Sequence, residues 1–208
     1  MRSVVKVSKT VEDAILEALK ELDVDRDDVS IDVIEEPSRG LFGLIGAKDA
    51  KIKVTVVNDP VDVAQNFIDK LLDGMDIKAK SNIRKGNSNL YIDITDINTT
   101  DMGILIGKRG NTLDSVQYLT SLVVNKGREN YVRVLVNSEG YREKREETLI
   151  NLAKKMAQKA KYSKRPVRLE PMNPYERRII HSALQNIEGI STHSEGEEPY
   201  RRVVIEAK

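Results

Sequence analysis

Ile106-Gly107-Lys108-Arg109-Gly110 separates two stretches of helical apolar spacing in the middle of this 208-residue chain. Two glycines bracket two cations, so the backbone can turn sharply and pass close to a phosphate group. Amide groups at the start of the helix after Gly110 add partial positive charge. A bare Gly-x-x-Gly is common as a plain turn between helices, so its meaning depends on the elements around it.

The elements around this loop follow a recognisable order. Hydrophobic periodicity and turn residues predict a helix over 60–74, strands over 77–85 and 89–97, a short helix from about Thr100, a longer helix after Gly110 and a strand over 132–136. This order resembles the type II KH fold, in which such a loop clamps about four nucleotides of RNA. The residues expected to contact single-stranded RNA here are Ile104, Ile106, Gly107, Lys108, Arg109, Gly110 and Leu113.

A nucleotide-binding P-loop is the competing interpretation of these glycines. That motif needs four residues between its glycines and a Ser or Thr directly after the Lys. Gly103 and Gly107 enclose only three residues, and Arg109 follows Lys108. The pattern therefore disfavours ATP binding.

Residues 1–58 predict a strand, a helix and two further strands. The last two strands flank a loop, residues 39–48, in which glycines recur at every third position between large apolar side chains. Such a loop can fold down to complete the core of a small domain, or it can project as a docking site for a partner. The docking alternative assigns the contact to Leu41, Phe42, Leu44 and Ile45.

The last third of the chain predicts a long helix over 141–162, a strand over 167–169, a helix from Asn173-Pro174 to about Asn186, and strands over 190–194 and 200–206. Arg177 and His181 lie four residues apart and so share one helical face, beside the apolar stripe. A histidine there can be structural, or it can contact nucleic acid together with the arginine. The residues expected to bind nucleic acid in this region are Arg177, Arg178, His181, Arg201 and Arg202.

Composition limits the classes of function. Net charge is +1 overall but about −3, 0 and +4 for residues 1–58, 59–138 and 139–208, so polyanion binding is expected in the last third. The chain has no cysteine and two histidines, which argues against thiol or zinc chemistry and against an enzyme. We expect no cofactor and no metal. No apolar run approaches the length of a membrane span, and the amino terminus lacks a secretory signal, so a cytoplasmic protein is expected.

These motifs in this order resemble the bacterial Jag family, also called SpoIIIJ-associated proteins, over nearly the whole chain. The motifs are the Gly-rich loop, the Gly107 to Gly110 loop with the helix after it, and Arg177-x-x-x-His181. The resemblance implies an α+β protein of three small domains: a βαββ Jag domain over 1–58, a type II KH domain over 59–138, and an α/β Arg-x-x-x-His domain with a short sheet over 139–208. Some relatives carry a long linker after the first domain, whereas only Asn58-Asp59-Pro60 stands there in this chain.

The function expected is therefore non-enzymatic binding of single-stranded RNA by two modules in series. The resemblance further implies a bacterial post-transcriptional regulator linked to cell elongation and division. Single-stranded DNA is an alternative ligand, and pairing of KH domains, either as a homodimer or with another small KH protein, is a further expectation. The rival interpretation is a protein-interaction adaptor that docks a membrane-associated partner through the Gly-rich loop.

Overall fold

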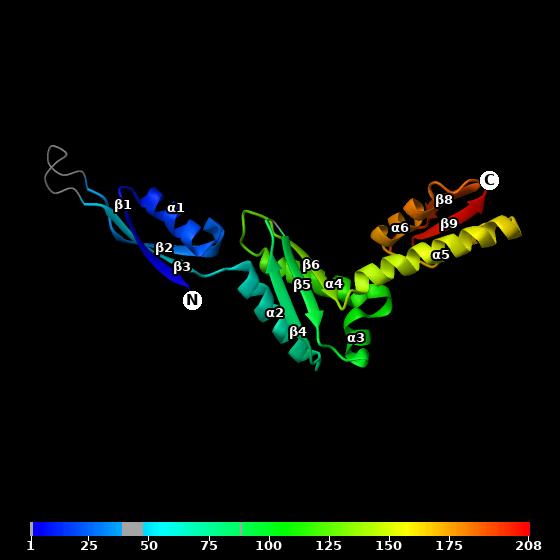
Figure 1. Cartoon of the computed structure of the whole chain (residues 1–208), viewed down its shortest axis with the longest axis horizontal. Helices are drawn as coiled ribbons and strands as arrows, with labels where there is room; N and C mark the ends of the chain where they lie inside the picture. Colours follow the sequence, from blue (N-terminus) through cyan, green and yellow to red (C-terminus); the bar gives the residue numbers. More distant parts are fainter. Residues whose placement is uncertain (1, 39–47, 88) are drawn as a thin grey trace. The chain divides into compact units, whose positions relative to one another are not determined.

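The computed structural model describes residues 2–38, 48–87 and 89–208, which divide into two compact units, residues 1–139 and 140–208 (Figure 1). The first unit contains two three-stranded sheets and the second contains a third. None of the helices in this part of the chain has both the length and the apolar character needed to cross a membrane.

The first sheet is antiparallel, with strand order β1-β3-β2 and one helix packed on one face. Its elements are β1 (Ser3–Ser8), α1 (Val11–Leu22), the 3-10 turn η1 (Arg26–Asp28), β2 (Val29–Glu35) and β3 (Ala50–Val56). The hydroxyl of Thr10 accepts a hydrogen bond from the Asp13 amide and so begins α1. Buried side chains of α1 and β3 form the core: Ala14, Ile15, Ala18, Ile52 and Val54.

The second sheet has the order β4-β5-β6, with β5 antiparallel to β4 and parallel to β6. The elements are α2 (Pro60–Gly74), β4 (Lys80–Lys85), β5 (Asn89–Thr95), α3 (Thr99–Ile106), the 3-10 turn η2 (Lys108–Gly110), α4 (Asn111–Val124) and β6 (Arg133–Ser138). Because β5 and β6 run in the same direction, α3 and α4 form the crossover between them. The loop at Gly107 therefore lies between the two crossover helices, and the segment after α4 lies at the opposite end of α4.

The second unit pairs two helices with a short antiparallel sheet of order β7-β9-β8. The elements are α5 (Tyr141–Ser163), β7 (Val167–Arg168), α6 (Pro174–Leu184), β8 (Ile190–Glu195) and β9 (Arg202–Ala207). Asn173 caps α6, its side chain accepting a hydrogen bond from the Glu176 amide, and Pro174 occupies the first turn. Alanines on α5 let α6 and β9 pack closely against it.

The α+β class and the element order of all three sheets are as the periodicity predicts. Differences lie at boundaries: β4 begins at Lys80 instead of residue 77, and α6 ends at Leu184, two residues before Asn186. The chain enters β2 through the 3-10 turn η1 (Arg26–Asp28), which the periodicity does not predict. The apolar loop residues Leu41, Phe42, Leu44 and Ile45 fall outside the described residues, so both interpretations of that loop stay open.

Candidate nucleic-acid interface

Gly107 occupies a backbone conformation that no other residue could adopt without displacing the loop. Its φ is 69° and its ψ is −173°, a region essentially restricted to glycine. A Cβ atom on Gly107 would lie 2.1 Å from Thr112 Oγ1 and 2.8 Å from Thr112 Cβ. The loop therefore folds tightly against the first turn of α4, as expected where a backbone must approach a phosphate.

Both flanking helices position the loop. The side chain of Asn98 accepts hydrogen bonds from the amides of Thr100 and Asp101, both at 3.0 Å, which begins α3. At the other end of α3, the Gly107 amide donates to Gly103 O at 2.9 Å. Gly110, with a φ of 85°, leads directly into α4 and is itself buried. The turn is therefore continuous with both helices, which fix its backbone conformation.

The start of α4 presents backbone donors beside the two cations. Gly110 stands at the capping position, so no side chain of the described residues caps this helix. Amides in the first turn of a helix attract anions. Lys108 is exposed, and Arg109 adopts a left-handed conformation, with a φ of 60°. Helix amides and two cationic residues are thus adjacent in the chain at this turn, a combination suited to a sugar-phosphate chain.

The three apolar residues predicted to contact RNA differ in exposure. Ile104 is 53% exposed on α3 and Ile106 is partly buried, so both can contact a ligand. Leu113 is completely buried in the α4 core with Val116. In this conformation Leu113 belongs to the core and does not line the surface of the loop.

Arg177 and His181 share one face of α6, and both have partners within the same unit. His181 Nδ1 lies 2.7 Å from Thr192 Oγ1, and its Nε2 lies 2.9 Å from Ser194 Oγ. Arg177 Nε donates to Met172 O at 3.3 Å, and Nη2 forms an ion pair with Glu198. The pair therefore ties α6 to β8 and to the loop after it.

The surroundings of His181 favour the neutral form of its ring. Burial is the largest cause lowering the pKa of His181, and the charges of Arg177 and His193 lower it further. A neutral imidazole donates from one nitrogen and accepts at the other, and hydroxyl partners can satisfy both. His181 thus contributes hydrogen bonding and packing at this position, and the positive charge comes from Arg177.

The expected cations of the second unit do not all share the surface of Arg177. Thr192 and Ser194 point toward α6, so alternate residues of β8 point to the opposite face of the sheet. Arg202 pairs in register with Glu195 and lies on that opposite face. Arg178 and Arg201 are exposed, Arg178 on α6 and Arg201 immediately before β9. The expected nucleic-acid residues of this unit therefore occupy at least two surfaces.

Sequence reasoning missed an ion pair that joins the first two domains. Arg128 Nη1 lies 2.5 Å from Asp28 Oδ1, and their side chains are 1% and 0% exposed. Arg128 Nη2 also donates to Asn58 O, and Nε donates to Val124 O at 2.8 Å. The neighbouring Asp27 carboxylate accepts from the amides of Glu129 and Asn130, both at 3.1 Å. No local sequence signal marks this pair, whose members lie 100 residues apart.

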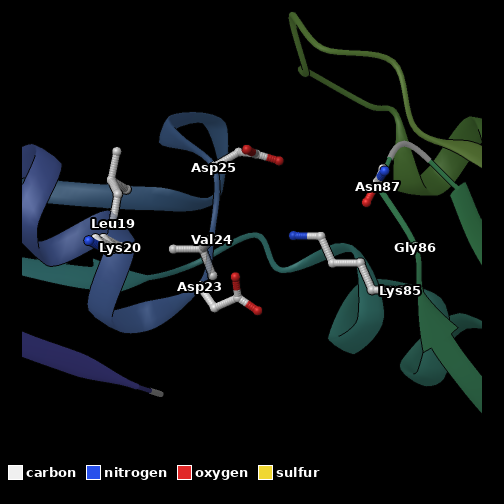
Figure 2. Close-up of a pocket in the computed structure, with 8 residues that line it drawn as sticks. All are labelled: Leu19, Lys20, Asp23, Val24, Asp25, Lys85, Gly86 and Asn87. Atoms are coloured by element: carbon white, nitrogen blue, oxygen red, sulfur yellow. The ribbon is translucent and has the colours of Figure 1, made fainter.

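The contact places the first domain at the end of α4 remote from the Gly107 loop, because Arg128 follows the carboxyl end of that helix. A cleft of about 510 Å³ lies beside the contact. Figure 2 shows Lys85 extending across this cleft toward the segment that carries Asp23 and Asp25. Acidic and basic side chains both line it, so it lacks the uniform positive charge that a phosphate chain prefers.

Three family models match consecutive parts of the chain. The model described as Jag N-terminus matches residues 7–56, and the model KhpA/KhpB, KH domain matches residues 61–136. The model of the domain named for its Arg-x-x-x-His signature matches residues 147–207. The second match contains the Gly107 loop, and the third contains Arg177 and His181.

Curated relatives match most or all of this chain. A protein of Clostridium symbiosum named RNA-binding protein KhpB is 46% identical over 208 residues, which cover 100% of this chain and 93% of the relative. The Bacillus subtilis (strain 168) protein of the same name is 35% identical over 210 residues, covering 100% of both chains. A further namesake from Streptococcus pneumoniae (strain D39) is 30% identical over 166 residues, 77% of this chain and 49% of the relative.

Proposed function

The chain belongs to the Jag/KhpB family of non-enzymatic RNA-binding proteins, as its motifs predicted, and from that premise we propose that it grips one strand of RNA with two modules in series. The first module is the Gly107 to Gly110 loop, and the second is the Arg-x-x-x-His domain around Arg177. The Gly107 geometry carries the proposal. It brings a glycine-only backbone, an exposed Lys108 and the amides at the start of α4 to one point.

Each module alone is expected to bind weakly. Tethering makes binding of the second module intramolecular, with an effective concentration in the millimolar range, and avidity can exceed either affinity by about 10²- to 10⁴-fold. The chain contains seven Tyr, two Phe and no Trp, which provides few stacking platforms and favours modest sequence selectivity.

A truncation tests the use of two modules. Residues 1–139 form a compact unit, so a chain that ends there is expected to keep the KH loop intact. We expect this shorter chain to bind a single-stranded RNA of about 15 nucleotides at least tenfold more weakly than the intact protein, because avidity is lost. Fluorescence anisotropy measures both affinities. Equal dissociation constants would exclude the second unit from binding that RNA.

Glu198 is expected to oppose RNA binding at Arg177. The Arg177 side chain is only 11% exposed and is neutralised by Glu198, which is 51% exposed, so a phosphate must displace this carboxylate. Glu198→Gln is expected to raise affinity for single-stranded RNA about two- to fivefold, the size of a surface ion pair. Glu197→Gln changes the net charge equally and is the matched control. Equal effects of the two variants would show that only overall charge matters.

The family resemblance extends the proposal to a bacterial post-transcriptional regulator linked to cell elongation and division. Pairing with another KH domain is proposed as well, and α4 supports it with exposed apolar side chains at Tyr118, Leu119 and Leu122. The molar mass of the protein in solution tests homodimerisation.

Docking of a membrane-associated partner through residues 39–48 is the rival proposal. A pull-down that keeps the same partner after ribonuclease treatment would favour this adaptor role.

A further inference from the structure

A groove of about 510 Å³ runs between α5 and α6, and its residues belong neither to the Gly107 loop nor to the Arg177 position that the proposed function uses. It combines an aromatic ring, two cations, one carboxylate and small or aliphatic side chains. The lining residues are Glu146, Ile150, Lys154, Tyr175, Arg178, Ile179, Ser182 and Ala183.

The two helices run in the same direction along the groove. Near the start of both, Tyr175 Oη donates to Glu146 Oε2 at 3.4 Å. Beyond the end of α6, a Cβ atom built on Gly189 would lie 3.7 Å from Lys161 Cε, near the end of α5. Lys154 lies two helical turns beyond Glu146, about 12 Å along α5 at ~1.5 Å per residue. The groove is therefore acidic at the Tyr175 end and basic farther along.

The α6 side of the groove presents a ring and then a cation. Tyr175 is 61% exposed, and Arg178 is exposed one turn later on the neighbouring face. Arg177 points to Glu198 instead, so the groove and the Arg177 position are separate surfaces of one helix. An exposed aromatic face beside two cations is the combination that single-stranded nucleic-acid sites use.

We propose that this groove binds one nucleotide of single-stranded RNA, with the base stacked on Tyr175 and the phosphate held by Arg178 and Lys154. The proposal rests on the RNA-binding function above and adds, within the second module, a contact separate from the Arg177 position. The carboxylate of Glu146 repels phosphate and accepts hydrogen bonds from base amino groups. It therefore orients the nucleotide with its base toward Tyr175 and its phosphate toward Lys154.

Charge complementarity selects this occupant over an apolar protein segment. Among the groove residues, only Ile150, Ile179 and Ala183 are aliphatic, and three carry charge. The nearby cation Arg145 is paired with Glu176 at 2.8 Å and so leaves the charge of the groove unchanged. A docking protein helix would need a continuous apolar stripe of anchors. A nucleotide needs a ring to stack on and cations at one end, and the groove provides both.

The test compares substitutions of exposed tyrosines in the full chain. Tyr175→Leu is expected to weaken binding of a single-stranded RNA about five- to tenfold, since stacking of one base is lost. Tyr175→Phe keeps the ring and is expected to bind within about twofold of the native protein. Tyr162→Leu removes a 95% exposed tyrosine of α5 that does not line the groove, and its affinity is expected to be unchanged.

Photocrosslinking with RNA that carries 4-thiouridine or 5-iodouridine provides a second readout. An adduct on Tyr175 is expected in the intact protein, together with adducts near Gly107. Native affinity in Tyr175→Leu and Arg178→Gln would overturn the proposal, as would adducts near Gly107 with none on α6. If the native protein binds no RNA, the proposed function itself fails with it.

Discussion

Replacing Asp28 with alanine is expected to lower the free energy of unfolding of the first unit by about 3–5 kcal/mol, because it leaves the charge of Arg128 buried without its partner. Both side chains are almost wholly inaccessible to solvent, so water cannot replace the lost carboxylate. Asp28 Oδ2 also accepts a hydrogen bond from the Asp25 amide at 3.1 Å, and that bond is lost too. This substitution is expected to be the most destabilising single change in the domain contact.

Urea unfolding monitored by circular dichroism measures the effect. Asp32→Ala removes the same type of charge from an exposed position of β2 and is the control, with an expected change of less than about 0.5 kcal/mol. Replacing both partners, Asp28→Leu with Arg128→Met, is expected to recover much of the loss, because an apolar pair leaves no buried charge. A loss below about 1 kcal/mol in Asp28→Ala would mean that the two domains are not joined by this pair.

Reversing both charges of the KH loop, Lys108→Asp with Arg109→Asp, is expected to weaken RNA binding by about 100-fold or more. Each charge-assisted hydrogen bond to phosphate contributes about 1.5–3 kcal/mol, and the new carboxylates repel the strand. Lys108 is exposed, so the fold is expected to survive its replacement. Anisotropy titration with single-stranded RNA measures the change.

A matched double variant shows whether the loss of RNA affinity comes from the loop itself or from the change in net charge. Lys70→Asp with Lys78→Asp changes the net charge by the same amount at exposed positions on α2 and just before β4. We expect that control to retain affinity within about threefold. Similar losses in both double variants would indicate non-specific attraction and would remove the loop from the mechanism.

The element order could be predicted because each segment carries its own signals. Asn173-Pro174 gives both the cap and the first-turn proline of α6, and Thr10 gives the cap of α1, so these helix starts lie where the local chemistry places them. Helix and strand ends were less exact, as at Leu184 and Lys80, because propensity changes gradually there. The parallel pairing of β5 with β6 was not predicted, because periodicity within a strand does not identify its neighbour in a sheet.

Only part of the candidate site could be predicted from the sequence, because some of its contacts join residues that are far apart in the chain. The glycine requirement at Gly107 arises from a contact five residues away, with Thr112, and a local motif can reveal it. The side-chain partners of His181 and Arg177 lie 11 to 21 residues away, on β8 and the loop after it, so sequence could not show that both side chains already have partners. The burial of Leu113 likewise depends on how α4 packs.

The salt dependence of single-stranded RNA affinity tests most directly whether this loop holds the phosphate chain. Log affinity is predicted to fall linearly with log salt, by about 0.7 for each phosphate neutralised. Lys108→Gln with Arg109→Gln should then flatten that slope by about 1.4 and weaken binding at low salt. Identical slopes and affinities for the native and substituted proteins would contradict the account.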